Sequence, residues 1–370
     1  MIENKTRSPF EIGVISTSEG GTLTIPQEII PQDQIQAVQR GLREAFGVTD
    51  IEDIRRITKG HTSALVYRIV VQGRPLLLRI IMYKSLGIGY DRQFTCMKLA
   101  AEAGLAPRVW YTSVEDRLSI TDFVNEVPFS AREALVRLPA ILRRLHSVPP
   151  FPKGVDHMDT TCMFLMHKTS AAEDFFRKFQ AANVLSGGDM EQLLAWHARF
   201  AAAYQCRDAD MVSSHNDVFK PDNILFDGQR VWLVDWEAAF LNDRYVDLAV
   251  IANLIVMDEA DEPVYLREYF GEEPSEYQLA RFFLMQQLAH MFYAVVFLMM
   301  GSAGQPMDWS PPAPSFRDIQ RRMWAGELNV AGKEAKIAYG RAHWERLVEN
   351  MRSPRLEEAF KIVSERHAYA

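Results

Sequence analysis

The feature that most constrains this fold is the stretch from Ser214 to Glu237, which reads SHNDVFKPDNILFDGQRVWLVDWE. Two short apolar runs, 224–226 and 231–234, lie on either side of Asp227-Gly228, and this order predicts a hairpin. A hairpin brings the residue before its first strand close to the residue after its second strand. The polar residues on the two outer flanks are therefore expected at the same end.

Those flanks carry Asn223 and Asp235, and Asp217 lies on the loop that leads into the hairpin. Transfer of a γ-phosphoryl group needs a carboxylate that orients the attacking hydroxyl, and oxygen ligands that hold Mg²⁺ against the phosphates. Asp217 can supply the first, and Asn223 with Asp235 can supply the second. The stretch therefore predicts a phosphoryl-transfer site rather than a hairpin whose polar residues only cap turns.

The same residues resemble the catalytic loop and metal-binding strand of the aminoglycoside phosphotransferase and choline kinase superfamily, the small-molecule relatives of the protein kinases. The resemblance implies that Asp217 is the catalytic residue, that Asn223 and Asp235 are metal ligands, and that ATP and Mg²⁺ are the cofactors. The segments most similar to the choline kinase branch are Val234-Asp235-Trp236-Glu237, Asn242-Asp243-Arg244 and Asp247-Leu248-Ala249.

One spacing departs from the family pattern. Asn223 lies six residues after Asp217, whereas the family places the Asn five residues after the Asp. The extra residue falls within Val218-Phe219-Lys220, so the loop is expected to bulge there. Lys220 is the candidate phosphate contact in this loop.

The resemblance also implies an α+β fold of the bilobal, protein-kinase-like type, with an antiparallel sheet in the N-lobe and a mostly helical C-lobe. We expect an N-terminal extension over residues 1–31, a nucleotide-binding N-lobe over 32–123, and a catalytic and substrate-binding C-lobe over 124–370. A chain of 370 residues with 48% hydrophobic residues is long enough for two lobes with full cores.

Patterns in the expected N-lobe agree with a sheet that covers a nucleotide. An amphipathic helix is predicted over 31–47, and apolar alternation predicts strands over 53–58, 65–72 and 75–82. The turn between the first two strands has short side chains, so its backbone N–H groups can approach phosphate oxygens. This candidate phosphate turn consists of Gly60, His61, Thr62 and Ser63.

The third of these strands carries Arg79, at the place where kinases hold the cation that contacts the α- and β-phosphates. The family places a partner acid early in the next helix, 91–103, where Asp91 is the nearest carboxylate. A further strand over 118–124 would carry the interlobe hinge. Backbone groups from Asp122 to Val124 would then bind adenine.

The rest of the chain has helical spacing. Asp247 is expected to cap or anchor the helix after the metal-binding strand through backbone N–H groups. His146 is expected to pack or cap, and His215 to brace the loop before Asp217. The predicted helices are 133–146, 190–204, 247–257, 276–300 and 333–350.

Composition indicates a soluble cytoplasmic enzyme. The net charge of −7 gives no basic field for nucleic acid, and three scattered cysteines form no C-x-x-C pair. The first thirty residues lack the apolar core of a signal peptide. Polar residues interrupt the apolar run 282–300, which favours a buried helix over a membrane span.

The expected acceptor is a small-molecule hydroxyl, that of choline or a related amino alcohol, with Glu237 near its cationic head. Two alternatives stay open: an aminoglycoside or other antibiotic phosphotransferase, and an inactive nucleotide-binding regulatory module. The inactive module is motivated by the longer loop between Asp217 and Asn223 and by the absence of a Glu early in the predicted helix 91–103. The oligomeric state stays open. Aromatic residues that could contact a cation are Tyr245, Tyr293, Trp309 and Trp324.

Overall fold

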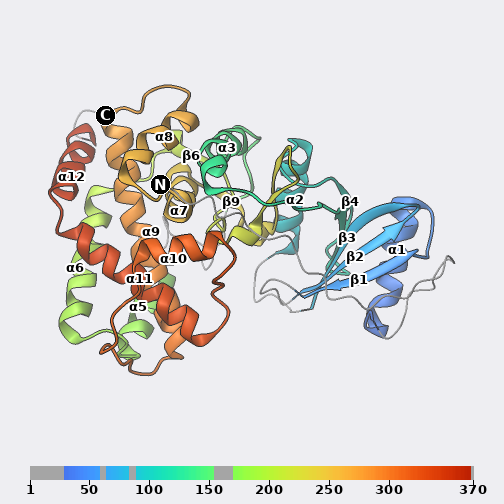
Figure 1. Cartoon of the computed structure of the whole chain (residues 1–370), viewed down its shortest axis with the longest axis horizontal. Coiled ribbons are helices and arrows are strands. Elements are labelled where there is room, and N and C mark those ends of the chain that lie inside the picture. The colour runs from blue at the N-terminus through green and yellow to red at the C-terminus, as the bar shows by residue number, and fades with distance from the viewer. Residues whose placement is uncertain (1–28, 59–63, 83–88, 154–169, 368–370) are drawn as a thin grey trace. The chain divides into compact units, whose positions relative to one another are not determined.

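The computed structural model describes residues 29–58, 64–82, 89–153 and 170–367. The candidate phosphate turn, Gly60 to Ser63, lies outside these residues. The chain forms two compact units, each described by itself below (Figure 1). Among the described residues, the sheet unit comprises those from 29 to 128 and Asp222–Glu237, and the helical unit comprises those from 129 to 221 and from 238 to 367. The predicted boundary at residues 123 and 124 stays a prediction.

The sheet unit contains a five-stranded antiparallel sheet with the order β1-β2-β3-β5-β4. The three predicted strands and the strand after residue 118 are confirmed. The remaining strand, β4, was not predicted, because all of its residues are half-buried and show no alternation. The strands are β1 Asp53–Ile57, β2 Ala64–Val71, β3 Arg74–Ile81, β4 Val109–Ser113 and β5 Leu118–Asp122.

Helix α1, Ile35–Phe46, packs on this sheet, as Figure 1 shows. Val38 and Leu42 of α1 are fully buried with the inward-facing residues of the strands. A side chain at Gly41 would bring its Cβ to 2.8 Å from the Tyr111 ring, so helix and sheet approach closely there. The helix ends at Gly47, whose φ of +73° suits glycine, as predicted.

Two further elements complete the sheet unit. Helix α2 spans Tyr90–Glu102, close to the predicted range. The predicted hairpin is confirmed as β7, Ile224–Phe226, and β8, Val231–Leu233, with Leu225 opposite Trp232. At its turn, the Asp227 carboxylate accepts the backbone N–H groups of Gln229 and Arg230. The Asp227 side chain thus satisfies backbone N–H groups that the tight turn cannot pair with backbone carbonyls.

The helical unit is built around α9, the 27-residue helix Glu276–Ser302, which packs against α7, α11 and α12. Glycines allow the closest of these approaches: a Cβ at Gly340 of α11 would lie 2.8 Å from the backbone nitrogen of Leu298. The helices are α3 Ala131–Leu145, α5 Ser170–Ala181, α6 Gly187–Ala203, α7 Arg244–Ile255, α8 Glu262–Phe270, α9, α10 Phe316–Trp324, α11 Lys333–Met351 and α12 Pro354–His367.

Among the described helices, α9 alone has the length and apolarity of a membrane span. Within its most apolar window, 83% of the residues are buried inside the fold. A core helix passes the same test of length and composition. The packing of α9 therefore agrees with the predicted buried helix.

A two-stranded sheet lies at the base of the predicted catalytic loop. Strand β6, Met211–Ser214, pairs antiparallel with β9, Phe240–Asp243. Helix α7 starts directly after β9, three residues earlier than predicted, and the Asp243 side chain caps it by accepting the N–H of Tyr245. The expected role of Asp247 in capping this helix is therefore wrong, because Asp247 lies inside α7.

Candidate active site

In the helical unit, Asp247 holds the loop that follows β6. We call His215, Asn216 and Asp217 the HND loop. One carboxylate oxygen of Asp247 accepts the backbone N–H of His215 at 2.9 Å, and the other accepts that of Asn216 at 2.8 Å. Asp247 is fully buried, so these bonds to a carboxylate fix the loop backbone strongly.

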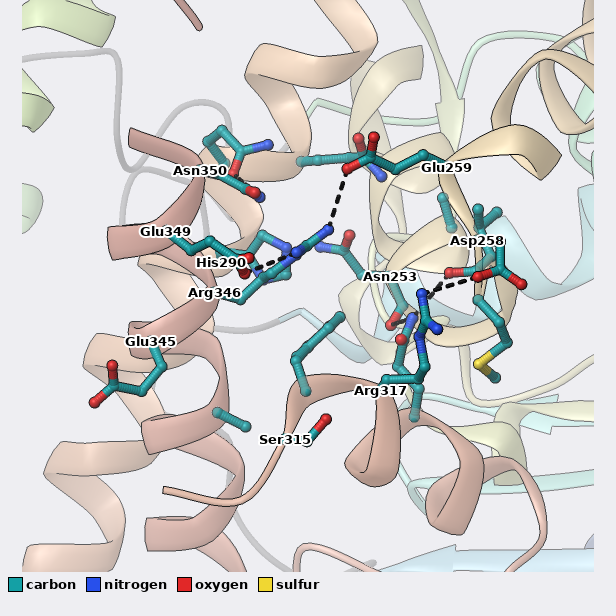
Figure 2. A pocket seen from close by; sticks show the side chains of 18 of the residues that line it. Asn253, Asp258, Glu259, His290, Ser315, Arg317, Glu345, Arg346, Glu349 and Asn350 are labelled. Carbon is teal, nitrogen blue, oxygen red and sulfur yellow. Dashed lines mark hydrogen bonds and ion pairs between the residues drawn. The ribbon is translucent and has the colours of Figure 1, made fainter. Parts of the chain in front are cut away.

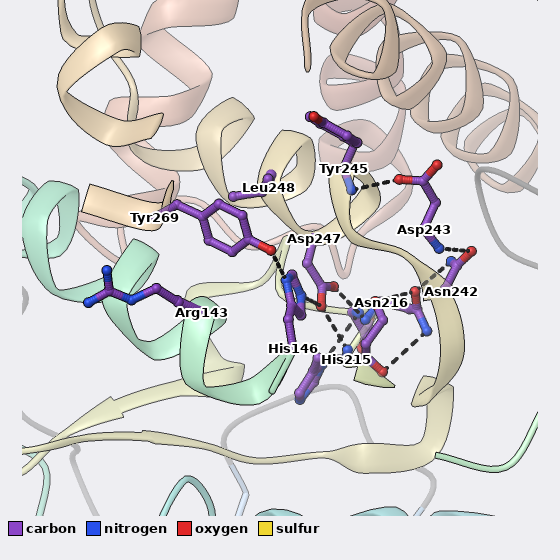
Figure 3. A network of polar contacts seen from close by, with 12 residues as sticks. Arg143, His146, His215, Asn216, Asn242, Asp243, Tyr245, Asp247, Leu248 and Tyr269 are labelled. Atoms are coloured by element: carbon purple, nitrogen blue, oxygen red, sulfur yellow. Dashed lines mark hydrogen bonds and ion pairs between the residues drawn. The ribbon is translucent and has the colours of Figure 1, made fainter. Parts of the chain in front are cut away.

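His146 and Tyr269 support Asp247 from the other side (Figure 3). The His146 Nε2 lies 3.2 Å from the Asp247 carboxylate, and its Nδ1 lies 2.7 Å from the Tyr269 hydroxyl. Burial lowers the pKa of His146, so the ring is neutral and donates through Nε2 while Tyr269 donates to Nδ1. Burial opposes ionisation of Asp247, but the His146 hydrogen bond and the loop N–H groups lower its pKa overall.

The Asn216 side chain ties the HND loop to β9. Its Oδ1 accepts the Asn242 side-chain N–H at 2.7 Å, and its Nδ2 donates to the Ala238 carbonyl at 3.0 Å. The Asn242 Oδ1 in turn accepts the N–H of Asp243, the residue that caps α7 (Figure 3). Asn216 adopts a left-handed φ of +65°, which Asn tolerates better than most residues. Two strands and one helix thus set the course of the loop.

These bonds leave the Asp217 side chain, 14% exposed, as the carboxylate of the HND loop. The Lys220 ammonium lies 3.2 Å from its Oδ2. The His215 ring accepts the backbone N–H of Asp217 at 3.4 Å, so in this bond His215 braces the loop as an acceptor rather than as the donor that was predicted. A carboxylate and a cation are therefore adjacent on one loop.

The extra residue of this loop has a structural use. Val218 and Phe219 are buried, and residues 218–220 form a turn. The Phe219 ring packs 5.0 Å from Tyr293 and 6.3 Å from Tyr339, centroid to centroid. Burial, with the nearby charge of Asp217 contributing, raises the pKa of both tyrosines. The longer loop thus anchors itself in the aromatic core of the helical unit.

In the sheet unit, the hairpin brings Asn223 and Asp235 to the same end, as predicted. Ile224 pairs with Leu233, and the N–H of Val234 donates to the Asn223 carbonyl at 3.0 Å. Asn223 is 4% exposed, and the Asp235 side chain is 22% exposed. Asp235 has φ of +68°, an uncommon conformation for a residue that is not glycine, and such strain is frequent at functional sites.

Arg79 of β3 reaches this end of the hairpin. Its Nη1 lies 2.7 Å from Asp235 Oδ1, and its Nη2 lies 3.7 Å from Glu237 Oε2. Asp91, the carboxylate nearest to the predicted partner position, is exposed in the first turn of α2 and makes no ion pair with any described residue. The acids that pair with Arg79 therefore come from the hairpin, a relationship that sequence spacing does not reveal.

Sequence reasoning missed Arg92 of α2. Its guanidinium donates to the Glu237 carbonyl at 2.9 Å. Arg92 as a whole is 7% exposed. Burial lowers the pKa of Arg92. An Arg at the third position of an otherwise ordinary helix gives no sequence signal of this role. It fixes the backbone directly after Asp235.

The strand that was expected to lead into the hinge ends at Asp122. The Asp122 N–H donates to the Arg108 carbonyl at 2.9 Å, and its carboxylate accepts from the Trp110 ring at 2.7 Å. The Asp122 amide is therefore used by the protein itself. Val124, two residues later, makes no backbone hydrogen bond to any described residue. Of the two predicted adenine contacts, Val124 is the one whose N–H and carbonyl make no backbone hydrogen bond within the described part of the chain.

Tyr245, predicted to face a cationic substrate, lies in the core. It is 2% exposed, and the Arg281 guanidinium lies 5.1 Å from its ring centroid. Arg281 also pairs with Asp243 at 2.7 Å. The face of the ring is thus used by a cation of the protein, so the expectation of a substrate contact is corrected.

The described residues contain no cluster of three or more His, Cys, Asp or Glu side chains suited to a metal ion. Mg²⁺ needs no such cluster, because it is usually bound through one or two carboxylates together with substrate phosphates and water. Asn223 and Asp235 offer oxygen ligands of the hard type that Mg²⁺ prefers. The donor set therefore fits Mg²⁺ and does not fit a structural zinc ion.

An antiparallel sheet with a half-buried Arg on its third strand, an acidic hairpin and a braced HND loop are typical of a kinase-like phosphotransferase. The profile of the family described as "Phosphotransferase enzyme family" (APH) matches residues 53–283, more than half of the chain. The chain belongs to this family. The comparison with curated protein sequences found no match.

Solved structures confirm the protein-kinase-like fold class. A choline/ethanolamine kinase family protein from Mesorhizobium loti is 18% identical, with a TM-score of 0.59, over 84% of this chain and 92% of that chain. The choline kinase LicA from Streptococcus pneumoniae is 12% identical, with a TM-score of 0.53, over 86% and 99%. A streptomycin–ATP–APH(2")-IIa ternary complex is also 12% identical, with a TM-score of 0.52, over 73% and 90%.

Proposed function

We propose that this protein transfers the γ-phosphoryl group of ATP, with Mg²⁺, to a hydroxyl of a small molecule, and that choline or a related amino alcohol is the acceptor. The observation that carries the proposal is the contact between Arg79 and Asp235 beside Asn223. It brings a cation suited to phosphates and two oxygen ligands suited to a metal to one end of the hairpin.

The nucleotide tasks belong to the sheet unit. Asn223 and Asp235 would hold Mg²⁺, which when bound neutralises phosphate charge during transfer. Arg79 would exchange its contact with Asp235 for the non-transferring phosphates. The backbone N–H and carbonyl of Val124 would bind adenine. In the proposal, Gly60, His61, Thr62 and Ser63 contact phosphate through backbone N–H groups.

The acceptor tasks begin with Asp217 of the helical unit. Asp217 would accept a hydrogen bond from the acceptor hydroxyl, orient its oxygen toward the γ-phosphorus, and take the proton as the new P–O bond forms. Lys220 now neutralises this carboxylate at 3.2 Å. In the proposal Lys220 turns to the transferred phosphoryl group, and the Asp217 carboxylate acts as the base.

The amino-alcohol assignment rests on charge and on similarity. Val234, Asp235, Trp236 and Glu237 resemble the choline kinase branch, and two of the similar structures are described as choline or choline/ethanolamine kinases. The net charge of −7 favours a cationic acceptor. Glu237 would attract its ammonium group through its carboxylate.

A substrate panel tests the proposal. ADP release and product mass are measured with Mg-ATP and choline, ethanolamine, an uncharged primary alcohol or streptomycin. The proposal expects a phosphorylated product that is 80 Da heavier, with choline or ethanolamine giving the highest kcat/KM. If streptomycin gives the highest kcat/KM, the acceptor would be an aminoglycoside instead of an amino alcohol, and the assignment of phosphoryl transfer would stand. Binding of Mg-ATP without turnover on any acceptor would instead support an inactive regulatory module.

A further inference from the structure

The helical unit contains a half-open cavity of about 1050 Å³ that the proposed reaction does not use. It lies between the C-terminal end of α7 and the helices α9, α10 and α11 (Figure 2). Asp217 is not among the residues that line it. The volume is at the upper end of the range for small-molecule sites.

Two amide side chains in this cavity lack partners. Asn253, 9% exposed, has a buried Nδ2 with no hydrogen bond to any described residue. Gln286 is 8% exposed, and its side-chain amide likewise makes no hydrogen bond within the described part of the chain. A buried donor left unpaired costs about 1–3 kcal/mol, so the Asn253 nitrogen calls for a partner that the cavity receives, and the accessible Gln286 amide can bond to the same partner.

A histidine adds a third polar group. The Nδ1 atoms of His290 and His343 lie 2.9 Å apart, so one ring donates and the other accepts. Burial lowers the pKa of His290 to about 3 and that of His343 well below its usual value, so both rings are neutral. The Nε2 of His343 is buried without a partner, which favours the tautomer that places no hydrogen there. His290, which lines the cavity, then carries its hydrogen on Nε2 (Figure 2).

The arginines that line this cavity are paired with carboxylates of the same lining. Arg317 pairs with Asp258 at 2.9 Å, and Arg346 pairs with Glu349 at 2.8 Å (Figure 2). Their carboxylates are exposed, at 52% and 69%. One lining carboxylate, Glu262, is buried, and it is paired with Arg355, whereas the other ion pairs lie at the exposed rim. A ligand with a net charge would therefore meet no buried charge that lacks a partner among the described residues.

We propose that the cavity is a second binding site, for an uncharged polyhydroxylated small molecule such as a sugar or cyclitol. Hydroxyl groups both accept and donate, so they match the donors of Asn253 and His290 and the amide of Gln286 at once. The site lies apart from the HND loop and does not depend on the proposed kinase function.

The experiment is calorimetric titration of the full-length protein with myo-inositol, D-glucose and glycerol, without nucleotide. Choline chloride and sodium glutamate are the charged comparators. We expect saturable binding of a cyclic polyol and no binding of either charged compound. Gln286→Leu and Asn253→Leu should each weaken that binding at least tenfold.

Gln287→Leu is the matched control. Gln287 is the next residue on α9, but its amide donates to the Phe283 carbonyl and accepts from the Asn350 side chain at 2.8 Å. We expect Gln287→Leu to lower the melting temperature and to change polyol affinity less than threefold. Gln286→Leu should leave the melting temperature unchanged or higher, because it breaks no bond within the protein.

Three results would overturn the inference. The first is that no polyol binds at 10 mM, a concentration that corresponds to about 3 kcal/mol of binding free energy. The second is a melting temperature of Gln286→Leu lowered as much as that of Gln287→Leu, which would make the unpaired amide a structural group. The third is loss of polyol binding in Asp217→Asn, which would make the cavity part of the acceptor site.

Discussion

Arg79 and Asp235 form an ion pair of 2.7 Å between Nη1 and Oδ1, although 156 residues separate them in the sequence. The guanidinium is 13% exposed, so solvent screens the pair only partly. In the proposed reaction Arg79 binds the phosphates and Asp235 binds Mg²⁺, but in this structure the two charges neutralise each other. Binding of Mg-ATP must therefore replace this contact by contacts with phosphate and metal.

Asp235→Asn should weaken Mg-ATP binding at least tenfold and reduce turnover further, because a neutral amide is a poorer ligand for Mg²⁺ and removes the charge that now pairs with Arg79. Calorimetric titration with Mg-ATP measures the affinity. Asp227→Asn is the control at the other end of the hairpin, where the carboxylate bonds only to the turn and the Trp232 ring. It should lower stability and leave the affinity unchanged. Parental Mg-ATP affinity in Asp235→Asn would remove Asp235 from the site.

Asp247→Asn should destabilise the protein by about 2–4 kcal/mol and lower kcat more than it changes Mg-ATP affinity. An amide cannot accept both loop N–H groups, since its nitrogen would face one of them. Urea denaturation and steady-state kinetics measure the two effects. Asp258→Asn, which alters an exposed ion pair, should change stability by less than about 0.5 kcal/mol. Equal effects of the two variants would argue against a special role of Asp247 in holding the HND loop.

Glu237→Gln should raise KM for a quaternary amine more than KM for an uncharged alcohol, because one ionic contact with the acceptor is lost. The structure adds a competing outcome. Glu237 Oε2 lies 3.7 Å from Arg79 Nη2, so a nucleotide role would raise KM for ATP instead. Kinetics with choline, an uncharged alcohol and varied ATP separate the two. A change in KM for ATP alone would withdraw the main residue-level support for an amino alcohol.

The hairpin and the first three strands were predictable because their signals are local. Asp227-Gly228 and its apolar flanks place Asn223 and Asp235 together without any knowledge of the rest of the fold. The contacts of Asp247 are different, since they depend on α7 lying beside the start of the HND loop. The substrate contact predicted for Tyr245 was wrong for a similar reason. Local sequence does not reveal that Arg281, far along the chain, lies over the Tyr245 ring.

Stability should fall as the pH is lowered through about 6.5, because burial lowers the pKa of His146, His290 and His343. Below the unfolded pKa, the unfolded chain binds protons that the folded protein does not, so each such group removes about 1.4 kcal/mol per pH unit. The effect for His290 extends down to its folded pKa of about 3.

Urea denaturation at pH 7.5 and 5.5 measures this dependence. The double variant His290→Gln/His343→Gln lacks two of the three groups, so its free energy of unfolding should depend less steeply on pH than that of the parent. Carboxylates contribute equally to both proteins and cancel in the comparison. An unchanged pH dependence in the double variant would mean that the two rings titrate alike in the folded and unfolded states.

The most direct test of the central claim compares Asp217→Asn with the parent protein in single-turnover transfer from Mg-ATP to choline, alongside Mg-ATP affinity by calorimetry. We predict that the parent forms phosphocholine, that Asp217→Asn loses at least about 10²-fold in rate, and that its Mg-ATP affinity changes less than threefold, because Asp217 acts on the hydroxyl. Near-parental phosphocholine formation by Asp217→Asn would contradict the account.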